Sequence, residues 1–307
     1  MVDHTPLGAA LWLARHHADY LLGVEGGDFS RWRGSLAEAE VERVLAIGGA
    51  LVQDWLEGRH AAIGPLDPLQ PGAWLTRAAG QVASQLLTPF DVDFDCGRLL
   101  FSDCRDPHFE EGTASRLLRG LVNCDGHSHI VALALAGRTR VELLEVPSHR
   151  LVGVPELVRG GRVYLDAYAG LPPFTIDRTT HDIAALDELA PIVVERDRRR
   201  VAQGSQPGDP LYLAKDYERA GATPLARPSA RARVVGPATG APQGASSHDV
   251  IGTYLEARAH HLFGARADAA RLYRSIAGRG RGREGWVGTL RTAARLFAAR
   301  LARAGEA

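Results

Sequence analysis

The fold of this chain is decided by the stretch from residue 123 to residue 137, which reads NCDGHSHIVALALAG. Asn123 is a good N-cap and Gly137 a good stop, so the pattern predicts a helix over residues 124–136. Cys124 would be the first residue of that helix. At this position the free backbone N–H groups and the positive end of the helix dipole favour a thiolate.

Three strands are predicted after this helix. They cover residues 140–146, 151–154 and 162–167, and Gly160-Gly161 marks the turn between the last two. A turn centred near residue 158 would set His149 opposite residue 166 or 167. Asp166 would then lie within reach of the imidazole, fixing its tautomer and supporting its protonated form.

Cys124, His149 and Asp166 are therefore the candidate catalytic residues, as nucleophile, general base and orienting carboxylate. The backbone N–H groups at the start of the helix could also hold an oxyanion. Asn123, Asp125 and His127 are candidate supporting residues. His127 lies one helical turn after Cys124, where it would either tune the thiolate or face solvent.

The order of a helix Cys, a strand His and a strand Asp resembles the transglutaminase-like superfamily of papain-type cysteine enzymes. Within that superfamily the chain is most similar to the SirB1-type bacterial proteins. Two segments carry this resemblance, EVPSHRLV at 145–152 and YLDAYAG at 164–170. They are similar to Pro-Gly-His-Phe-Leu and Leu-Asp-Pro-Phe-Gly-Gly in that group, with Ser148 and Ala167 as departures. The segment RLLRGLVNC at 116–124 resembles the group's approach to its core helix.

The resemblance covers about residues 90–180 and, weakly, the C-terminal helices. It implies an α+β fold with a papain-like core and an antiparallel sheet. It also implies a cysteine hydrolase or acyl-transfer enzyme acting on amide or thioester bonds, peptidases included, with a peptide or protein substrate. No cofactor and no metal are expected. The alternative is a non-catalytic protein-interaction scaffold of the SirB1 type, whose C-terminal helices bind a protein partner.

Composition shifts divide the chain into four predicted segments. Residues 1–88 form a helical region with helices over 7–22, from Ser35 to about residue 55, and over 71–87. Residues 89–218 form the core, and 219–247 a linker rich in Pro, Gly and Ala. Residues 248–307 form a helical module whose part 253–277 resembles one tetratricopeptide-type helix pair. A single pair cannot bury its own apolar face, so a third helix over 286–301 is expected to cover it.

Bulk properties point to a soluble, cytoplasmic protein with reduced thiols. The 307 residues carry no net charge, 45% are hydrophobic, and the three cysteines are too few for a disulfide scaffold. The N-terminal residues do not have the pattern of a signal peptide, and no apolar run approaches the length of a membrane span.

The sequence also contains the residues of three other kinds of candidate site. Cys96, Cys104 and Cys124 could join His127 and His129 around zinc, but paired Cys-x-x-Cys spacing is missing. The acids at 91, 93 and 95 do not continue as a calcium loop, because residue 96 is Cys and residue 102 is Ser. After residue 250 eleven arginines stand against four acidic residues, with RGRGR at 279–283. A solvated helix face explains this charge better than a nucleic-acid partner.

Overall fold

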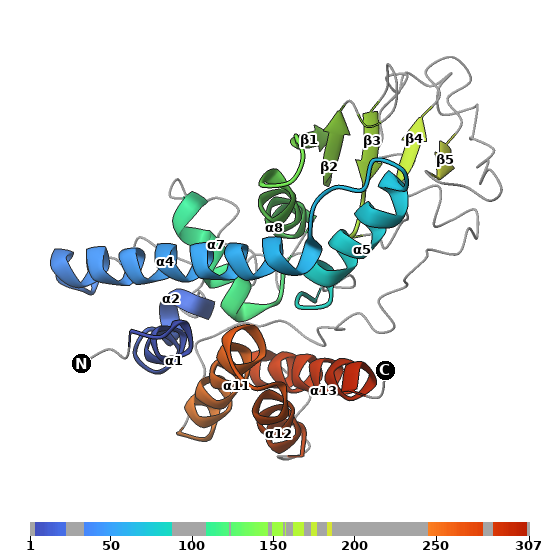
Figure 1. Cartoon of the computed structure of the whole chain (residues 1–307). Helices are drawn as coiled ribbons and strands as arrows, with labels where there is room; N and C mark the ends of the chain where they lie inside the picture. The colour runs from blue at the N-terminus through green and yellow to red at the C-terminus, as the bar shows by residue number, and fades with distance from the viewer. Residues whose placement is uncertain are drawn as a thin grey trace, which may run out of the picture. The chain divides into compact units, whose positions relative to one another are not determined.

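The computed structural model of the chain describes residues 4–22, 34–87, 109–122, 124–146, 149–155, 157, 162–168, 173–176, 183–185, 245–278 and 285–305. At some ends of helices and strands it describes the backbone alone, and this is so for Cys124 and His149. The chain forms two compact units, whose helices and strands are labelled in Figure 1. The first unit comprises Met1–Gly58, Ser84–Asn123 and Arg231–Ala307, and the second Arg59–Ala83 and Cys124–Ala230.

The second unit contains the sheet. Its strands are β1 (Glu142–Val146), β2 (His149–Pro155), β3 (Arg162–Leu165), β4 (Phe174–Ile176) and β5 (Ile183–Ala185). They lie in the order β1-β2-β3-β4-β5, and each is antiparallel to its neighbour. Such an up-and-down arrangement needs only short connections between neighbouring strands. Helices together with an antiparallel sheet confirm the predicted α+β class.

The register of the β2–β3 hairpin corrects one prediction. Val152 pairs with Leu165 and Val154 with Val163, and these four buried residues share one face of the sheet. Continued by one step, this register sets Asp166 opposite Leu151 and not opposite His149. The predicted turn centre was half a residue too early, because the register is fixed by the burial of these four apolar side chains.

Helix α8 (Cys124–Ala136) has the bounds that the sequence predicts. It packs against β2 and β1, and helix α5 (Pro71–Ala83) packs against it in turn. Ile130, Val131, Ala134 and Leu135 form its buried apolar part. Glycine is required at position 137 for a further reason, since a Cβ there would lie 2.4 Å from the ring of His60.

The N-terminal helices belong mainly to the first unit. They are α1 (Pro6–His16), α2 (Ala18–Leu22) and α4 (Glu38–Ile63), whose last residues belong to the second unit. The single helix predicted over 7–22 was wrong, because His17 interrupts it with φ −133° and ψ 41°. The His17 side chain is buried, with its ring centroid 4.7 Å from that of Trp12 and its Nε2 3.3 Å from a Glu40 oxygen. The break between α1 and α2 therefore coincides with the burial of the His17 side chain.

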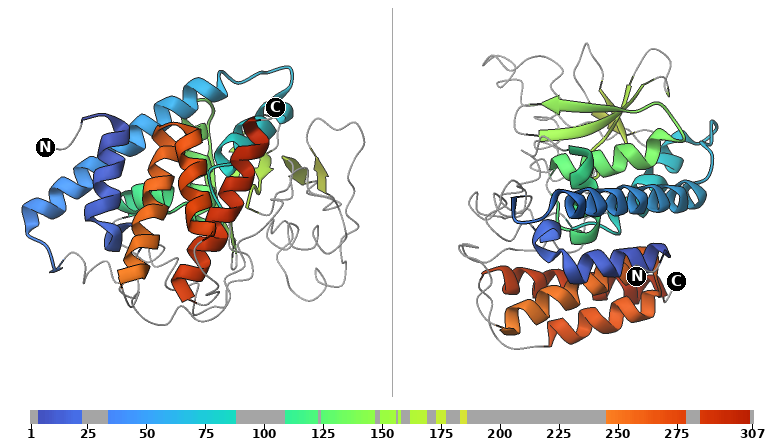
Figure 2. Two further views of the ribbon diagram at one scale, coloured as in Figure 1. Left: turned by 90° about the horizontal axis from the view of Figure 1, so that it is seen from below. Right: turned by 90° about the vertical axis from the view of Figure 1, so that its left-hand side faces the viewer.

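Three helices at the C-terminal end lie side by side (Figure 2). They are α11 (Ala245–Phe263), α12 (Arg266–Ala277) and α13 (Gly285–Gly305), so the predicted helix pair and the third helix are confirmed as helices. Their shared core includes Tyr254, Tyr273, Leu290, Ala293 and Phe297, all fully buried. The rings of Tyr273 and Phe297 stack with centroids 5.4 Å apart. The third helix therefore covers the apolar face of the pair, as expected.

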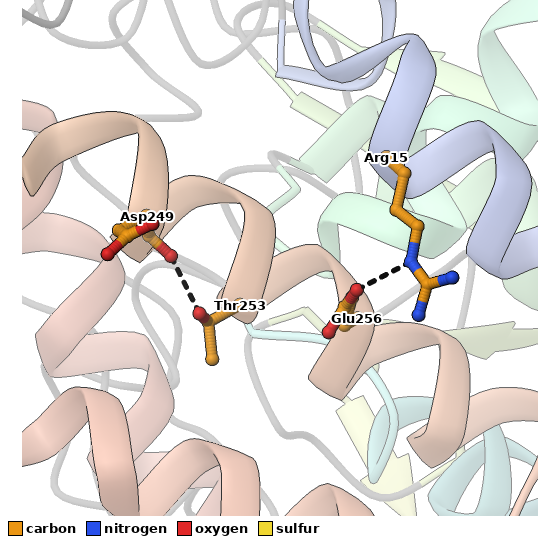
Figure 3. A network of polar contacts seen from close by, with 4 residues as sticks. All are labelled: Arg15, Asp249, Thr253 and Glu256. Carbon is orange, nitrogen blue, oxygen red and sulfur yellow. Dashed lines mark hydrogen bonds and ion pairs between the residues drawn. The ribbon is translucent and has the colours of Figure 1, made fainter. Parts of the chain in front are cut away.

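Helix α1 packs along α11, far from it in the sequence. The Nε of Arg15 donates to a Glu256 oxygen at 2.7 Å, and Thr253 donates to the Asp249 carbonyl at 2.6 Å (Figure 3). The ion pair is partly exposed, so it contributes little beyond orientation. The apolar residues of α1, Ala10, Leu13 and Ala14, belong to the same core as those of α11. This shared core joins the two ends of the chain in one unit.

Buried polar side chains of α11 cap the C-terminal end of helix α7 (Phe109–Arg119). Arg258 is fully buried and donates to the carbonyls of Leu117 at 2.6 Å and Leu118 at 3.2 Å. The Tyr254 hydroxyl donates to the Arg119 carbonyl at 2.7 Å, and burial raises the pKa of Tyr254, so the donor keeps its proton. These donors satisfy carbonyls that a helix end leaves without partners. We call Arg258 and Tyr254 the α7 cap.

Gly120 follows α7 and leads into a short bridge with residue 87. Its φ is +70°, a conformation that favours glycine, and it passes close to the guanidinium of Arg258. Leu87 donates to the Gly120 carbonyl at 2.6 Å and accepts from Val122 at 3.0 Å. Arg300 of α13 donates to the Leu86 carbonyl at 2.6 Å. Burial, with Arg258 nearby, lowers the pKa of Arg300 to about 10, and the side chain still stays charged at neutral pH.

The two compact units group the chain differently from the four predicted segments. The N-terminal and C-terminal helices share the first unit, and α5 belongs to the unit with the sheet. Composition marks linkers but does not reveal which apolar faces meet, and here the faces of α1 and α11 meet. Most of the predicted linker lies outside the described residues, although α11 begins within it at Ala245. Among the described helices, none combines the length and apolar character that crossing a bilayer requires.

Candidate active site

Cys124 is the first residue of α8, as the sequence predicts. The structure describes its backbone, which places it where the first N–H groups of a helix lack intrahelical partners. Any anion at this position gains from those N–H groups and from the helix dipole. Of the predicted supporting residues, Asn123 lies outside the described residues, and Asp125 is described only by its backbone within α8.

His149 is the first residue of β2, where it pairs with Val146 of β1. Asp166 directly follows β3, and its side chain is only 1% exposed. A carboxylate is rarely buried to this extent unless polar groups surround it. Because β2 and β3 are antiparallel, the start of β2 and the end of β3 lie at the same end of the hairpin. His149 and Asp166 therefore come from adjacent strand ends.

The register leaves His149 and Asp166 diagonal to one another. The register of β2 and β3, extended one step beyond Leu165, places Asp166 opposite Leu151, two residues from His149 along β2. On this extension, backbone alternation assigns positions 149, 151 and 166 to the same face of the sheet. Diagonal neighbours of this kind lie about 7–8 Å apart between Cα atoms, within reach of an imidazole. The predicted direct opposition is replaced by this diagonal relation.

The first turn of α8 contacts the chain just beyond β3. The rings of His127 and Tyr168 meet edge to face, with centroids 6.2 Å apart and planes at 78°. His127 lies three residues after Cys124, and Tyr168 two residues after Asp166. Residues three apart on a helix lie on the same side of it. The contact thus brings the beginning of α8, with Cys124, close to the end of β3, with Asp166.

His127 is buried, with 2% of its surface exposed, and Ser128 beside it is 4% exposed. The alternative that His127 faces solvent was therefore wrong. The first turn of α8 contains several polar residues, which are ordinarily exposed to solvent. Nothing in the sequence pattern indicates that His127 and Ser128 are buried. Tertiary packing around α8, which contacts β2, β1 and α5, accompanies their burial. His127 and Ser128 thus add polar groups to the interior near the start of α8.

Tyr168 is the residue that sequence reasoning missed. It appears in the segment that carries the family resemblance, but it was assigned no role. Its contact with His127 depends on a turn at Ala167–Tyr168 that follows β3. The available signal was its position two residues after Asp166, although the predicted strand over 162–167 gave no indication of a turn there.

The alternative metal sites receive no support from the described residues. Among them, no group of three or more His, Cys, Asp or Glu side chains could hold a metal ion. Two of the proposed zinc ligands, Cys96 and Cys104, lie outside the described residues, as does the acidic stretch at 91–95. The basic segment at 279–283 lies outside them too.

Comparisons with protein-family models, with curated proteins and with solved structures give no match to this chain. The described structure establishes an α+β protein. One unit is helical, and in the other a helix packs on a five-stranded antiparallel sheet. Any function must therefore be argued from the residues themselves.

Proposed function

We propose that this chain is a cysteine hydrolase or acyl-transfer enzyme of the transglutaminase-like type, acting on amide or thioester carbonyls. Cys124 is the nucleophile, His149 the general base and Asp166 the group that orients the base. One observation carries the proposal. A helix that begins with Cys124 packs on β2, which begins with His149, and its first turn contacts the chain just after Asp166.

The chemistry requires only these three residues and the backbone. His149 takes the proton of the Cys124 thiol, and the thiolate attacks the carbonyl carbon of the substrate. The resulting oxyanion is held by N–H groups at the start of α8. His149 then gives its proton to the leaving amine or thiol as the carbonyl re-forms in a thioester. A water or amine, deprotonated by His149, attacks the thioester, and Cys124 leaves as the thiolate and is reprotonated.

Burial of Asp166 supports its orienting role. A carboxylate that is 1% exposed can hold an imidazole N–H in one tautomer without competition from bulk water. The order of helix, strand and strand, with the antiparallel sheet, supports a transglutaminase-like core. A peptide or protein substrate is part of this proposal, on the strength of the resemblance alone.

The scaffold hypothesis stays a second prediction. It requires a surface on the C-terminal helices for a protein partner. Among the described residues, the large hydrophobic side chains that are well exposed are Leu69 and Leu143, and neither lies on α11, α12 or α13. The described side chains of α11, α12 and α13 thus supply no observation in favour of the scaffold.

The test is the rate at which iodoacetamide labels Cys124 as a function of pH, measured on the peptide that contains it by mass spectrometry. An activated Cys124 reacts well below its ordinary pKa of about 8.5, and His149→Ala abolishes that reactivity. His60→Ala is the matched control, because His60 belongs to the same unit but lies against Gly137 at the other end of α8. Labelling that follows an ordinary thiol titration in the unsubstituted protein would end the enzymatic proposal.

A further inference from the structure

The contact between His127 and Tyr168 joins two segments that the sheet does not hold together. β3 ends at Leu165, and the chain turns at Ala167–Tyr168, so ladder hydrogen bonds no longer position the residues that follow. On the other side of the contact, α8 packs on β2 and β1, and its buried apolar residues begin at Ile130, after the first turn. The pair of His127 and Tyr168 is a ring contact between this first turn and the segment that follows β3.

The geometry of this contact is directional. An edge-to-face pair requires the edge of one ring to point at the face of the other, with centroids about 4.5–7 Å apart. The observed values, 6.2 Å and 78°, fall within this arrangement. His127 is 2% exposed and Tyr168 half-buried, so the ring of His127 has little freedom to turn away. The pair therefore limits rotation of α8 about its own axis at the end where Cys124 lies.

We infer that Tyr168 is a positioning residue, whose ring holds the first turn of α8 beside the end of β3 and so aligns Cys124 with Asp166 and His149. The inference rests on the function proposed above and adds to it a residue that touches none of the reacting atoms. Small displacements matter at such a site, because a shift of about 1 Å in a reacting group can cost about 100-fold in rate.

The ring is the functional part of Tyr168 in this inference, and the hydroxyl is not. The two can be separated by substitution. Tyr168→Phe keeps the ring, whereas Tyr168→Leu removes it while filling part of the space. Tyr164 offers a matched control, because it lies four residues earlier and its ring stacks on Phe174 with centroids 5.5 Å apart. Tyr164→Leu removes an aromatic contact between β3 and β4 and leaves the His127–Tyr168 pair intact.

The experiment is the pH profile of iodoacetamide labelling at Cys124 in the full chain, for these three variants. We expect Tyr168→Leu to move the midpoint toward higher pH and to slow labelling at pH 7 by up to about tenfold, as loss of an aromatic pair allows. Tyr168→Phe should restore the profile of the unsubstituted protein, and Tyr164→Leu should leave it unchanged. If Tyr168 had a purely structural role, Tyr168→Leu would lower the thermal stability without moving the midpoint of the labelling profile.

Two results would overturn the inference and are distinguishable from failure of the proposed function. If Cys124 is activated in the unsubstituted protein and Tyr168→Leu has the same profile, Tyr168 does not position the nucleophile. If Tyr168→Phe behaves like Tyr168→Leu, the ring contact is not the cause. If Tyr168→Leu does not fold, Tyr168→Met replaces it, because its longer side chain fills more of the volume without a ring. An ordinary thiol profile in the unsubstituted protein contradicts the enzymatic proposal itself.

Discussion

Replacement of Gly120 by alanine tests the packing around the α7 cap. Gly120 has φ +70°, which costs a residue with a Cβ about 1–2 kcal/mol. The added Cβ would also lie 2.5 Å from Cζ of Arg258. An exposed arginine could move aside at little cost. Arg258 is fully buried, bonded to two carbonyls, and lies 4.4 Å from the centroid of the Phe297 ring.

Displacement of Arg258 therefore adds a packing cost of about 1–3 kcal/mol. Together with the backbone cost, Gly120→Ala should lower the free energy of unfolding by about 2–5 kcal/mol, a large part of the stability of an ordinary domain. Urea denaturation followed by circular dichroism at a helical wavelength measures this loss. The first unit, which contains α7 and α11, is the one expected to unfold earlier.

Gly64→Ala is the matched control for this substitution. Gly64 has φ +71°, and a Cβ there would meet nothing within 4 Å, so only the backbone cost of about 1–2 kcal/mol applies. The two glycines belong to different units, so each loss is measured from that unit's own transition. In an Arg258→Ala background the cost of Gly120→Ala should fall to that of the control. Equal losses for Gly120→Ala and Gly64→Ala in the unsubstituted background would refute the reasoning.

Two further predictions concern single side chains of the first unit. Tyr254→Phe should lower the free energy of unfolding by about 1 kcal/mol or more, because it removes the donor to the Arg119 carbonyl. A urea midpoint for Tyr254→Phe equal to that of the unsubstituted protein would contradict this. Burial lowers the pKa of His17 below its ordinary 6.5, against the opposing effect of Glu40, so the folded protein favours the neutral imidazole. Stability from this residue is present above pH 6.5 and is lost as pH falls through the lowered pKa. A thermal unfolding series from pH 7 to pH 5 should therefore fall more steeply for the unsubstituted protein than for His17→Gln, and parallel series would exclude the effect.

Local signals in the sequence predicted several elements well. The bounds of α8 follow from a stretch of apolar residues between Asn123 and Gly137, and the hairpin strands follow from short apolar runs between turn residues. Those features depend on neighbours within a few residues, which the sequence displays directly. The break at His17 was missed because it accompanies burial against Trp12 and Glu40, and the latter comes from another helix.

At the candidate site too, local pattern predicts the elements, whereas their register and contacts depend on tertiary structure. Local pattern predicts that Cys124 begins a helix and that His149 lies near the start of a strand, apart from a shift of two residues at the start of β2. It wrongly placed Asp166 inside the strand predicted over 162–167, because β3 ends at Leu165. The one-step shift in register could not be predicted, because it depends on which of two sets of apolar side chains is buried together. The contact between His127 and Tyr168 joins residues 41 positions apart, and no local pattern specifies it.

The sequence by itself determined the α+β class, the helix that begins with Cys124, and the types of side chain available for chemistry. The tertiary structure alone decided that the two ends of the chain share a core, that Arg258 caps α7, and that His127 is buried against Tyr168. The physical reason is that helix and strand formation depend on interactions within a few residues. Burial, register and side-chain contacts depend instead on which distant apolar faces exclude water together.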